Sequence, residues 1–283
     1  MVHVPKIALA ALFIGLPMSA PCGQQRLPTP PESALPTPPY ADYADLIVAA
    51  PVIVDATVRS ELRLKPIDAP GLRPGAARLY IEADVLALIR GPGAVATRIG
   101  YTIDVPLNAK GKPPRYRKSR VLLFARGVAG TVGQVQLVRP DGQRGWTPGG
   151  DALTRRIVRE TLAPDAPPVV TGIGNAFHTP GNIPGEGDTQ IFLSTADGRP
   201  ISLGIVRRNG QPPFWSVALG EVVGEGAPPP PRDTLLWYRL ACTLPPALPD
   251  AVIRSTGSDA EVAREDYALV VGSLGPCDRG GRL

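Results

Sequence analysis

Two long stretches of this sequence alternate apolar and polar residues with a period of two, and this alternation constrains the fold more than any other feature. The first stretch is residues 52–64 (VIVDATVRSELRL) and the second is residues 78–89 (RLYIEADVLALI). A period of two is typical of a β-strand that buries one face, and it does not fit an amphipathic helix. The sequence therefore predicts two long strands near the start of the folded region.

Further elements complete a first domain, which we place at residues 41–163. Shorter strands are predicted at residues 98–105, 121–125 and 132–138, after a short amphipathic helix at residues 41–49. A second helix is predicted to begin with Asp151 as its cap and to end at Leu162. Strands followed by a covering helix indicate an OB or netrin-like barrel, or a Greek-key sandwich.

A second domain is predicted at residues 172–283, after a linker at residues 163–171. Asp197-Gly198 and Asn209-Gly210 are hairpin turn signals that predict an antiparallel meander of three strands. A helix at residues 234–243, capped by Asp233, should follow. Ser258 and Glu261 then form a capping box for a short helix before a last strand at residues 267–272. The 35 prolines and 31 glycines agree with a chain that has many turns. The predicted fold class is mainly β, with a minor α+β part in the second domain.

The stretches DTQIFLSTADGRPISL (188–203) and RDTLLWYRLAC (232–242) resemble an uncharacterised, hypothetical exported protein family of sphingomonad-type alphaproteobacteria. The resemblance covers most of the chain after residue 20. It implies export and the extent of the domains, and it implies no chemistry.

The N-terminal 20 residues read as a secretory signal peptide. Lys6 precedes an apolar run that ends at Leu16, and the small residues up to Ala20 fit a cleavage site. We expect cleavage after Ala20, no transmembrane segment in the remaining chain, and a periplasmic or secreted protein. Residues 21–40 repeat PTPP twice and predict a proline-rich linker. A lipoprotein anchored at Cys22 is the alternative, although Ser19 and Pro21 do not match a lipobox.

Export makes a disulfide the expected state of two of the three cysteines. Cys242 and Cys277 lie in the same C-terminal region, and they are the natural pair in an oxidising compartment. Cys22 remains as a third thiol close to the predicted cleavage site. The pairing predicts about 4 kcal/mol of stabilisation from closing the intervening loop.

Few residues after the predicted cleavage site could carry catalysis, and we assign no catalytic residue. His178 is the one imidazole left, no G-x-S-x-G elbow is present, and His178 reads as a surface or partly packed residue. The segment HTPGNIPGEGD (178–188) could close on a divalent ion, but it lacks a recognised metal motif, so we predict no metal and no cofactor. The alternative function is a carboxylate-dependent envelope hydrolase, with Glu186 paired to Glu221 or Glu225.

The segment KGKPPRYRKSR (110–120) is the strongest candidate for a binding site. Six of its eleven residues are cationic: Lys110, Lys112, Arg115, Arg117, Lys118 and Arg120. A dense cationic loop attracts phosphates of lipopolysaccharide or membrane lipid, or another anionic polymer. Nucleic acid is disfavoured because the chain is expected to be exported. The sequence therefore favours a non-enzymatic binding or scaffolding module for an anionic envelope component or another envelope protein.

Overall fold

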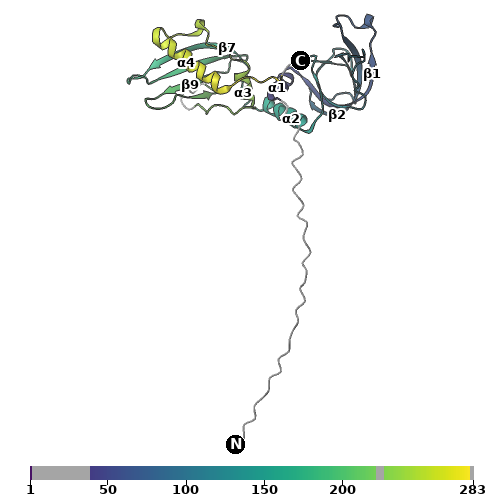
Figure 1. The fold of residues 1–283 in the computed structure, drawn as a ribbon, viewed down its shortest axis with the longest axis horizontal. Coiled ribbons are helices and arrows are strands. Elements are labelled where there is room, and N and C mark those ends of the chain that lie inside the picture. The colour runs from purple at the N-terminus through teal and green to yellow at the C-terminus, as the bar shows by residue number, and fades with distance from the viewer. Residues whose placement is uncertain (2–38, 221–225, 281–283) are drawn as a thin grey trace. The chain divides into compact units, whose positions relative to one another are not determined.

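The first half of the chain folds into a nearly closed antiparallel barrel. The computed structural model describes residue 1, residues 39–220 and residues 226–280. The barrel strands follow the order β3-β2-β1-β4-β5, with β6 beside β4. The edges of β3 and β5 meet through a parallel bridge between Gly100 and Gln134, next to a 2.8 Å hydrogen bond from Gly100 N to the carbonyl oxygen of Gly133. Figure 1 shows this barrel with β1 and β2 in its wall. The strands are β1 (Val52–Arg63), β2 (Ala76–Arg90), β3 (Arg98–Pro106), β4 (Arg120–Gly127), β5 (Val135–Leu137) and β6 (Gln143–Gly145).

The alternation in the sequence places one apolar face of each long strand inside this barrel. Residues such as Val54, Ile81 and Tyr101 are almost fully buried there, in one cluster with side chains from β4 and β5. Burial of this row on every strand is the main force that sets the register, because a slip by one residue would turn each apolar row outwards. The predicted mainly β fold is confirmed, and of the two predicted arrangements the first domain has the barrel.

The second half of the chain forms an antiparallel meander in the order β10-β9-β8-β7. The two predicted hairpin turns are present, and Gly198 and Gly210 take the left-handed conformation that these turns need, with φ of 76° and 73°. Strand β7, absent from the sequence prediction, pairs with β8 and extends the meander. The strands are β7 (Val170–Pro180), β8 (Gly187–Thr195), β9 (Ile201–Arg207) and β10 (Phe214–Ala218).

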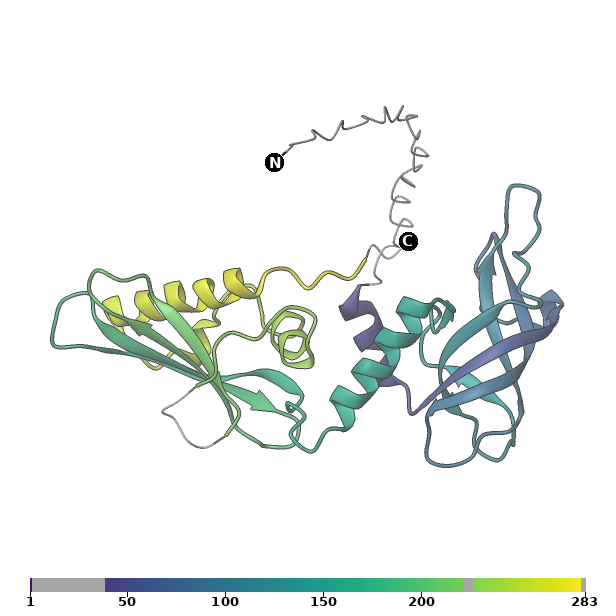
Figure 2. The same cartoon turned by 90° about the horizontal axis from the view of Figure 1, so that it is seen from below.

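One helix covers a face of the second sheet, and two others lie between this sheet and the barrel. Figure 2 shows α4 along one face of the second sheet, with α1 and α2 on the side towards the barrel. One buried cluster draws side chains from α1, α2, α3, α4, β4 and the second sheet, so these elements share a continuous core. The helices are α1 (Tyr40–Ala49), α2 (Pro148–Leu162), α3 (Leu235–Ala241) and α4 (Gly257–Leu274), with 3-10 turns η1 (Pro66–Asp68) and η2 (Asp250–Val252).

The structure corrects the predicted C-terminal elements. Residues 257–274 form one helix, so the predicted strand at residues 267–272 is wrong and Ser258 lies inside the helix. The buried residues explain the helix, because they recur every three or four positions: Ala260, Ala263, Tyr267, Val270 and Leu274.

Threonines cap two helices for which the sequence suggested aspartates. Thr147 accepts a hydrogen bond from Gly150 N at the start of α2, and Thr234 accepts one from Trp237 N at the start of α3. Thr147 lies one helical turn before the predicted cap Asp151, and Thr234 lies one residue after the predicted cap Asp233. Asp151 sits inside α2, where it pairs with Arg155 at 3.0 Å.

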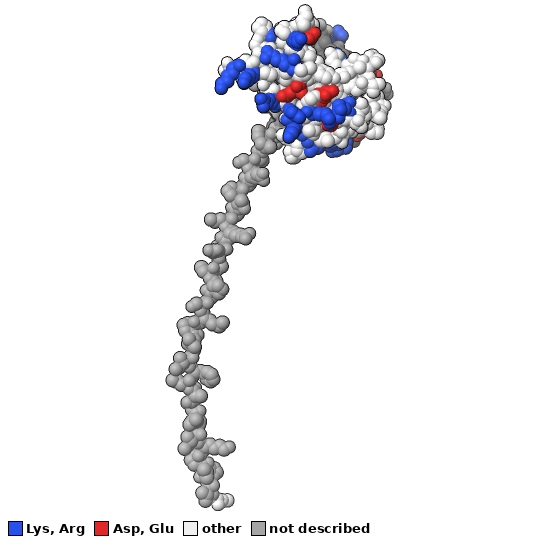
Figure 3. Space-filling model, turned by 90° about the vertical axis from the view of Figure 1, so that its right-hand side faces the viewer, with Lys and Arg blue, Asp and Glu red and all other residues white. Residues whose placement is uncertain are grey.

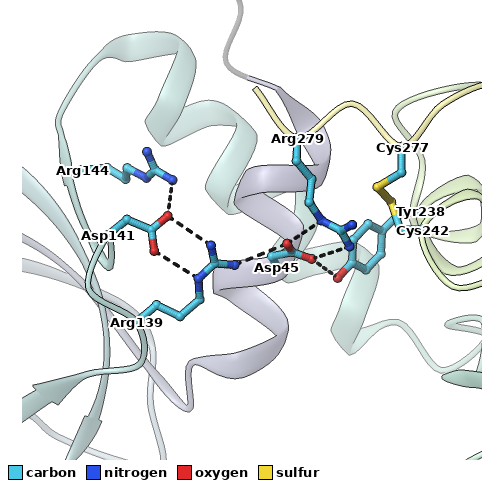
Figure 4. A network of polar contacts seen from close by, with 8 residues as sticks. All are labelled: Asp45, Arg139, Asp141, Arg144, Tyr238, Cys242, Cys277 and Arg279. Carbon is cyan, nitrogen blue, oxygen red and sulfur yellow. Dashed lines mark hydrogen bonds and ion pairs between the residues drawn. A yellow bond between two sulfur atoms is a disulfide. The ribbon is translucent and has the colours of Figure 1, made fainter. Parts of the chain in front are cut away.

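The predicted disulfide between Cys242 and Cys277 is confirmed, with a Cα–Cα distance of 5.0 Å. It joins the end of α3 to the C-terminal segment, and Figure 4 shows the polar network beside it. Asp45 of α1 accepts hydrogen bonds from Tyr238 Oη at 2.8 Å and from Arg279 Nε at 2.8 Å. The disulfide therefore holds the segment that carries Arg279 close to its partner on α1.

Several predictions concern residues outside the described part of the chain. Residues 2–20 of the predicted signal peptide, Cys22 and the proline tract up to residue 38 belong to this group. No helix in the described part of the chain has both the length and the apolarity needed to cross a membrane.

Candidate functional site

The predicted cationic segment lies in the connection between β3 and β4, residues 107–119, which we name the basic loop. Its first turn is fixed by Asn108, whose Oδ1 accepts from the backbone N of Lys110 at 2.9 Å and of Lys112 at 3.0 Å. Its second half runs beside β1, where Tyr116 N donates to Glu61 Oε2 at 2.6 Å. These bonds hold the loop in one shape against the barrel.

The end of the basic loop contains a residue in an unusual conformation. Lys118 has a φ of 69°, which side chains other than glycine rarely adopt. Its backbone N donates to the carbonyl oxygen of Val58 at 2.8 Å, and Ser119 N donates to the carbonyl oxygen of Tyr116 at 2.8 Å. Such a conformation persists only where surrounding contacts fix it, so this part of the loop is preorganised.

The six predicted cations all lie on the surface, but Arg120 differs from the other five. Arg120 is the first residue of β4, and its guanidinium forms two hydrogen bonds with Asp55, at 2.9 and 2.6 Å. Asp55 is 1% exposed, and the same guanidinium lies over the Trp146 ring at 3.9 Å. The hydrogen bond to Asp55 raises the pKa of Arg120. Arg120 thus neutralises a buried carboxylate at the base of the loop.

The other five cations are exposed on the basic loop. Within the described residues, no ion pair forms at Lys110, Lys112, Arg115, Arg117 or Lys118. Arg115, Arg117 and Lys118 line an open groove of about 1110 Å³ together with residues 57–61 of β1. Arg59 adds a fourth cation to this groove, although it also lies 3.5 Å from Asp84. Of the described residues that line the groove, Glu61 alone is acidic, and it accepts the Tyr116 N–H.

The barrel topology brings a second connection to the same end. Residues 64–75 join β1 to β2, and Leu107 N at the start of the basic loop donates to the carbonyl oxygen of Gly75 at 2.8 Å. This connection and the end of β1 carry Arg63, Lys65 and Arg73, all exposed and without an ion pair within the described residues.

We name this region the basic end of the barrel. It carries eight cations with no ion pair in the described part of the chain, and the segments that hold them, residues 61–75 and 107–119, contain two acids, Glu61 and Asp68. Figure 3 shows the barrel side of the molecule, where Lys and Arg side chains gather with acidic side chains between them. The eight cations are Arg63, Lys65, Arg73, Lys110, Lys112, Arg115, Arg117 and Lys118. A surface of this kind attracts phosphate and other anions.

A second polar cluster, which the sequence analysis did not find, lies under α4. His178 of β7 is 9% exposed, more buried than the sequence suggested, and its Nδ1 is 2.9 Å from Thr189 Oγ1. The Thr189 hydroxyl donates to Asp266 of α4, and Asp266 also accepts from Arg207 Nε at 2.8 Å. A Cβ atom at Gly187 would lie 2.6 Å from His178 Nε2, so the imidazole ring packs directly against the Gly187 backbone. The cluster attaches α4 to the second sheet.

The acidic residues considered for catalysis or metal binding are engaged elsewhere or lie outside the described residues. Glu186 accepts from Asn209 N at 3.0 Å, and Asp188 pairs with Arg208 at 3.3 Å. Glu221 and Glu225 lie outside the described residues, so the hydrolase alternative stays a prediction. In residues 39–220 and 226–280, no group of three or more His, Cys, Asp or Glu side chains is placed to hold a metal ion.

Comparison of the chain with protein-family models and with curated proteins finds no match. The basic end of the barrel is therefore the candidate site on physical grounds alone.

Proposed function

We propose that this chain is a non-enzymatic binding module of the bacterial envelope that uses the basic end of its barrel to bind a phosphate-bearing partner. The observation that carries the proposal is that eight cations with no ion pair among the described residues lie at one end of the barrel, on the end of β1 and on two connections. Unpaired cations keep their full charge for a partner, whereas cations in ion pairs are already neutralised.

Export supports an envelope partner over nucleic acid. The first 20 residues have the zones of a secretory signal peptide, and the Cys242–Cys277 disulfide is compatible with an oxidising compartment. We infer a periplasmic or secreted location, as the resemblance to an exported family also implies. The abundant phosphates outside the cytoplasm are those of lipopolysaccharide and anionic phospholipids, and these are the proposed ligand class.

The test compares two double variants of the chain without residues 1–20. Arg115→Gln with Arg117→Gln removes two cations that line the groove of the basic end. Arg159→Gln with Arg254→Gln removes two exposed arginines outside the barrel strands and serves as the matched control. Binding of each protein to lipopolysaccharide and to phosphatidylglycerol vesicles is measured by calorimetric titration.

Each cation near an anionic surface contributes about 1 kcal/mol. The Arg115→Gln, Arg117→Gln variant should therefore lose about 2 kcal/mol, which weakens binding by about 25-fold. The control should lose less than about threefold, because its arginines lie away from the basic end. Equal binding by the two variants, or no binding of either ligand by the unmodified protein, would refute the proposal.

A further inference from the structure

Two large aliphatic side chains are exposed at the basic end of the barrel. Ile67 lies in the turn η1 and is 85% exposed, and Leu62 lies at the end of β1 and is 63% exposed. They are five residues apart in the sequence, and Arg63 and Lys65 lie between them. Aliphatic residues this exposed gain free energy whenever a partner removes them from water.

Backbone hydrogen bonds fix the turn that carries Ile67. Asp68 N donates to the carbonyl oxygen of Lys65 at 2.9 Å, and Ala69 N donates to that of Pro66 at 3.2 Å. Ala69 is 4% exposed, and Arg78 Nη1 of β2 donates to the carbonyl oxygen of Pro70 at 3.2 Å, which ties the connection to the barrel. Ile67 is therefore presented on a preorganised turn, and little conformational entropy is lost when it enters an apolar environment.

The opposite end of the barrel lacks the combination of exposed aliphatic side chains and cationic connections. Its two connections, residues 91–97 (GPGAVAT) and 128–134 (VAGTVGQ), contain no charged residue. Val132 in the second of them is 94% exposed, so single exposed aliphatic residues occur at both ends. Only the end with Ile67 and Leu62 combines them with the eight unpaired cations.

We propose that the basic end docks on the surface of an anionic phospholipid bilayer, with Ile67 and Leu62 inserted between the lipid headgroups. The inference rests on the proposed function and narrows its ligand class from phosphates in general to a membrane. Charge complementarity selects the bilayer, because its anionic headgroups meet the cations while the boundary of its acyl region takes up the aliphatic side chains. A soluble polyanion offers no apolar phase for Ile67.

Neither the cations nor the aliphatic side chains suffice alone, because stable association with a membrane takes two signals. Each cation contributes about fivefold in the partition coefficient. Burial of the two aliphatic side chains contributes about tenfold more, if each loses half of its exposed surface.

The experiment measures sedimentation with vesicles and binding to soluble polyphosphate. The chain without residues 1–20 is mixed with vesicles of phosphatidylcholine alone or with added phosphatidylglycerol, and separately with sodium polyphosphate. Ile67→Ser with Leu62→Ser removes the aliphatic surface, and Val132→Ser is the control at the uncharged end. Circular dichroism verifies that each variant is folded.

The double variant should partition about tenfold less into vesicles that contain phosphatidylglycerol and should bind polyphosphate as the unmodified chain does. Val132→Ser should leave both unchanged. Equal partitioning of the double variant and the unmodified chain would overturn the inference. Binding to polyphosphate without binding to vesicles would also overturn it while leaving the proposed function intact, and binding to neither would overturn both.

A second readout follows insertion directly. Ile67→Trp should give an additional fluorescence that shifts to shorter wavelength on phosphatidylglycerol vesicles, and Val132→Trp should give no such shift. Identical spectra of the Ile67→Trp variant with and without vesicles, under conditions where the protein sediments with them, would contradict insertion.

Discussion

Removal of the disulfide should destabilise the chain strongly, because the bond joins the C-terminal segment to the end of α3. The two cysteines are 35 residues apart in the sequence. In the chain-entropy description, closing a loop of that length stabilises the native state by about 4 kcal/mol. For a folded region of this size, 1 kcal/mol changes the melting temperature by about 2–4 °C, so Cys242→Ser with Cys277→Ser should lower it by about 8–16 °C.

The assay is thermal unfolding of the chain without residues 1–20, followed by circular dichroism. All proteins carry Cys22→Ser, which removes the third thiol and with it intermolecular pairing, and the protein with this change alone is the control. Mass spectrometry under non-reducing conditions verifies that the control contains the Cys242–Cys277 bond. A control that contains the bond and melts within about 1 °C of the double variant would refute this reasoning, since the expected difference is several times larger.

Three further predictions test the helix α4, the buried network at α1 and the packing around His178. Ala268→Pro, in the middle of α4, should cost about 3 kcal/mol or more in urea unfolding, against about 1 kcal/mol for Ala268→Gly, and equal effects would argue against a helix at this position. Burial raises the pKa of Asp45, but hydrogen bonds from Arg279 and Tyr238 outweigh it and leave the pKa below its ordinary value. The ionised form therefore stabilises the fold above about pH 4, and the stability advantage over Asp45→Asn should shrink as the pH falls through the lowered pKa; an advantage independent of pH would contradict this. Gly187→Ala places a Cβ atom 2.6 Å from the His178 ring and 2.7 Å from the Thr179 carbonyl oxygen, so it should cost about 1–3 kcal/mol in thermal unfolding, and an unchanged midpoint would show that the ring can move aside.

The sequence predicted the barrel strands because burial of one face leaves a period of two that local inspection can detect. Strand β7 was missed for the opposite reason. Glycines at positions 172 and 174 remove side chains from the pattern, and register shifts after Val170 and Ile173 break its period. The run at residues 267–272 looked like a strand because its residues favour strands locally, and the helical spacing of the buried residues emerges only over the whole of α4.

The candidate site could be predicted in part. A dense run of cations can be recognised in any sequence, so the basic loop could be predicted. That the connection at residues 64–75 lies at the same end of the barrel could not, because it depends on how the strands pair. Asp55 illustrates the same limit, because it occupies a polar position of an alternating strand and yet is buried under Arg120, 65 residues away. The distinction between Arg120, which neutralises Asp55, and the unpaired cations likewise requires the fold.

The salt dependence of binding tests the central claim most directly. Raising the ionic strength from about 0.01 M to about 0.15 M shortens the screening length from about 30 Å to about 8 Å. If the basic end binds phosphate-bearing surfaces through its unpaired cations, partitioning onto phosphatidylglycerol vesicles should fall about tenfold or more over this range, and partitioning onto phosphatidylcholine vesicles should stay low throughout. Binding that is insensitive to salt, or equally strong on both kinds of vesicle, would contradict the account.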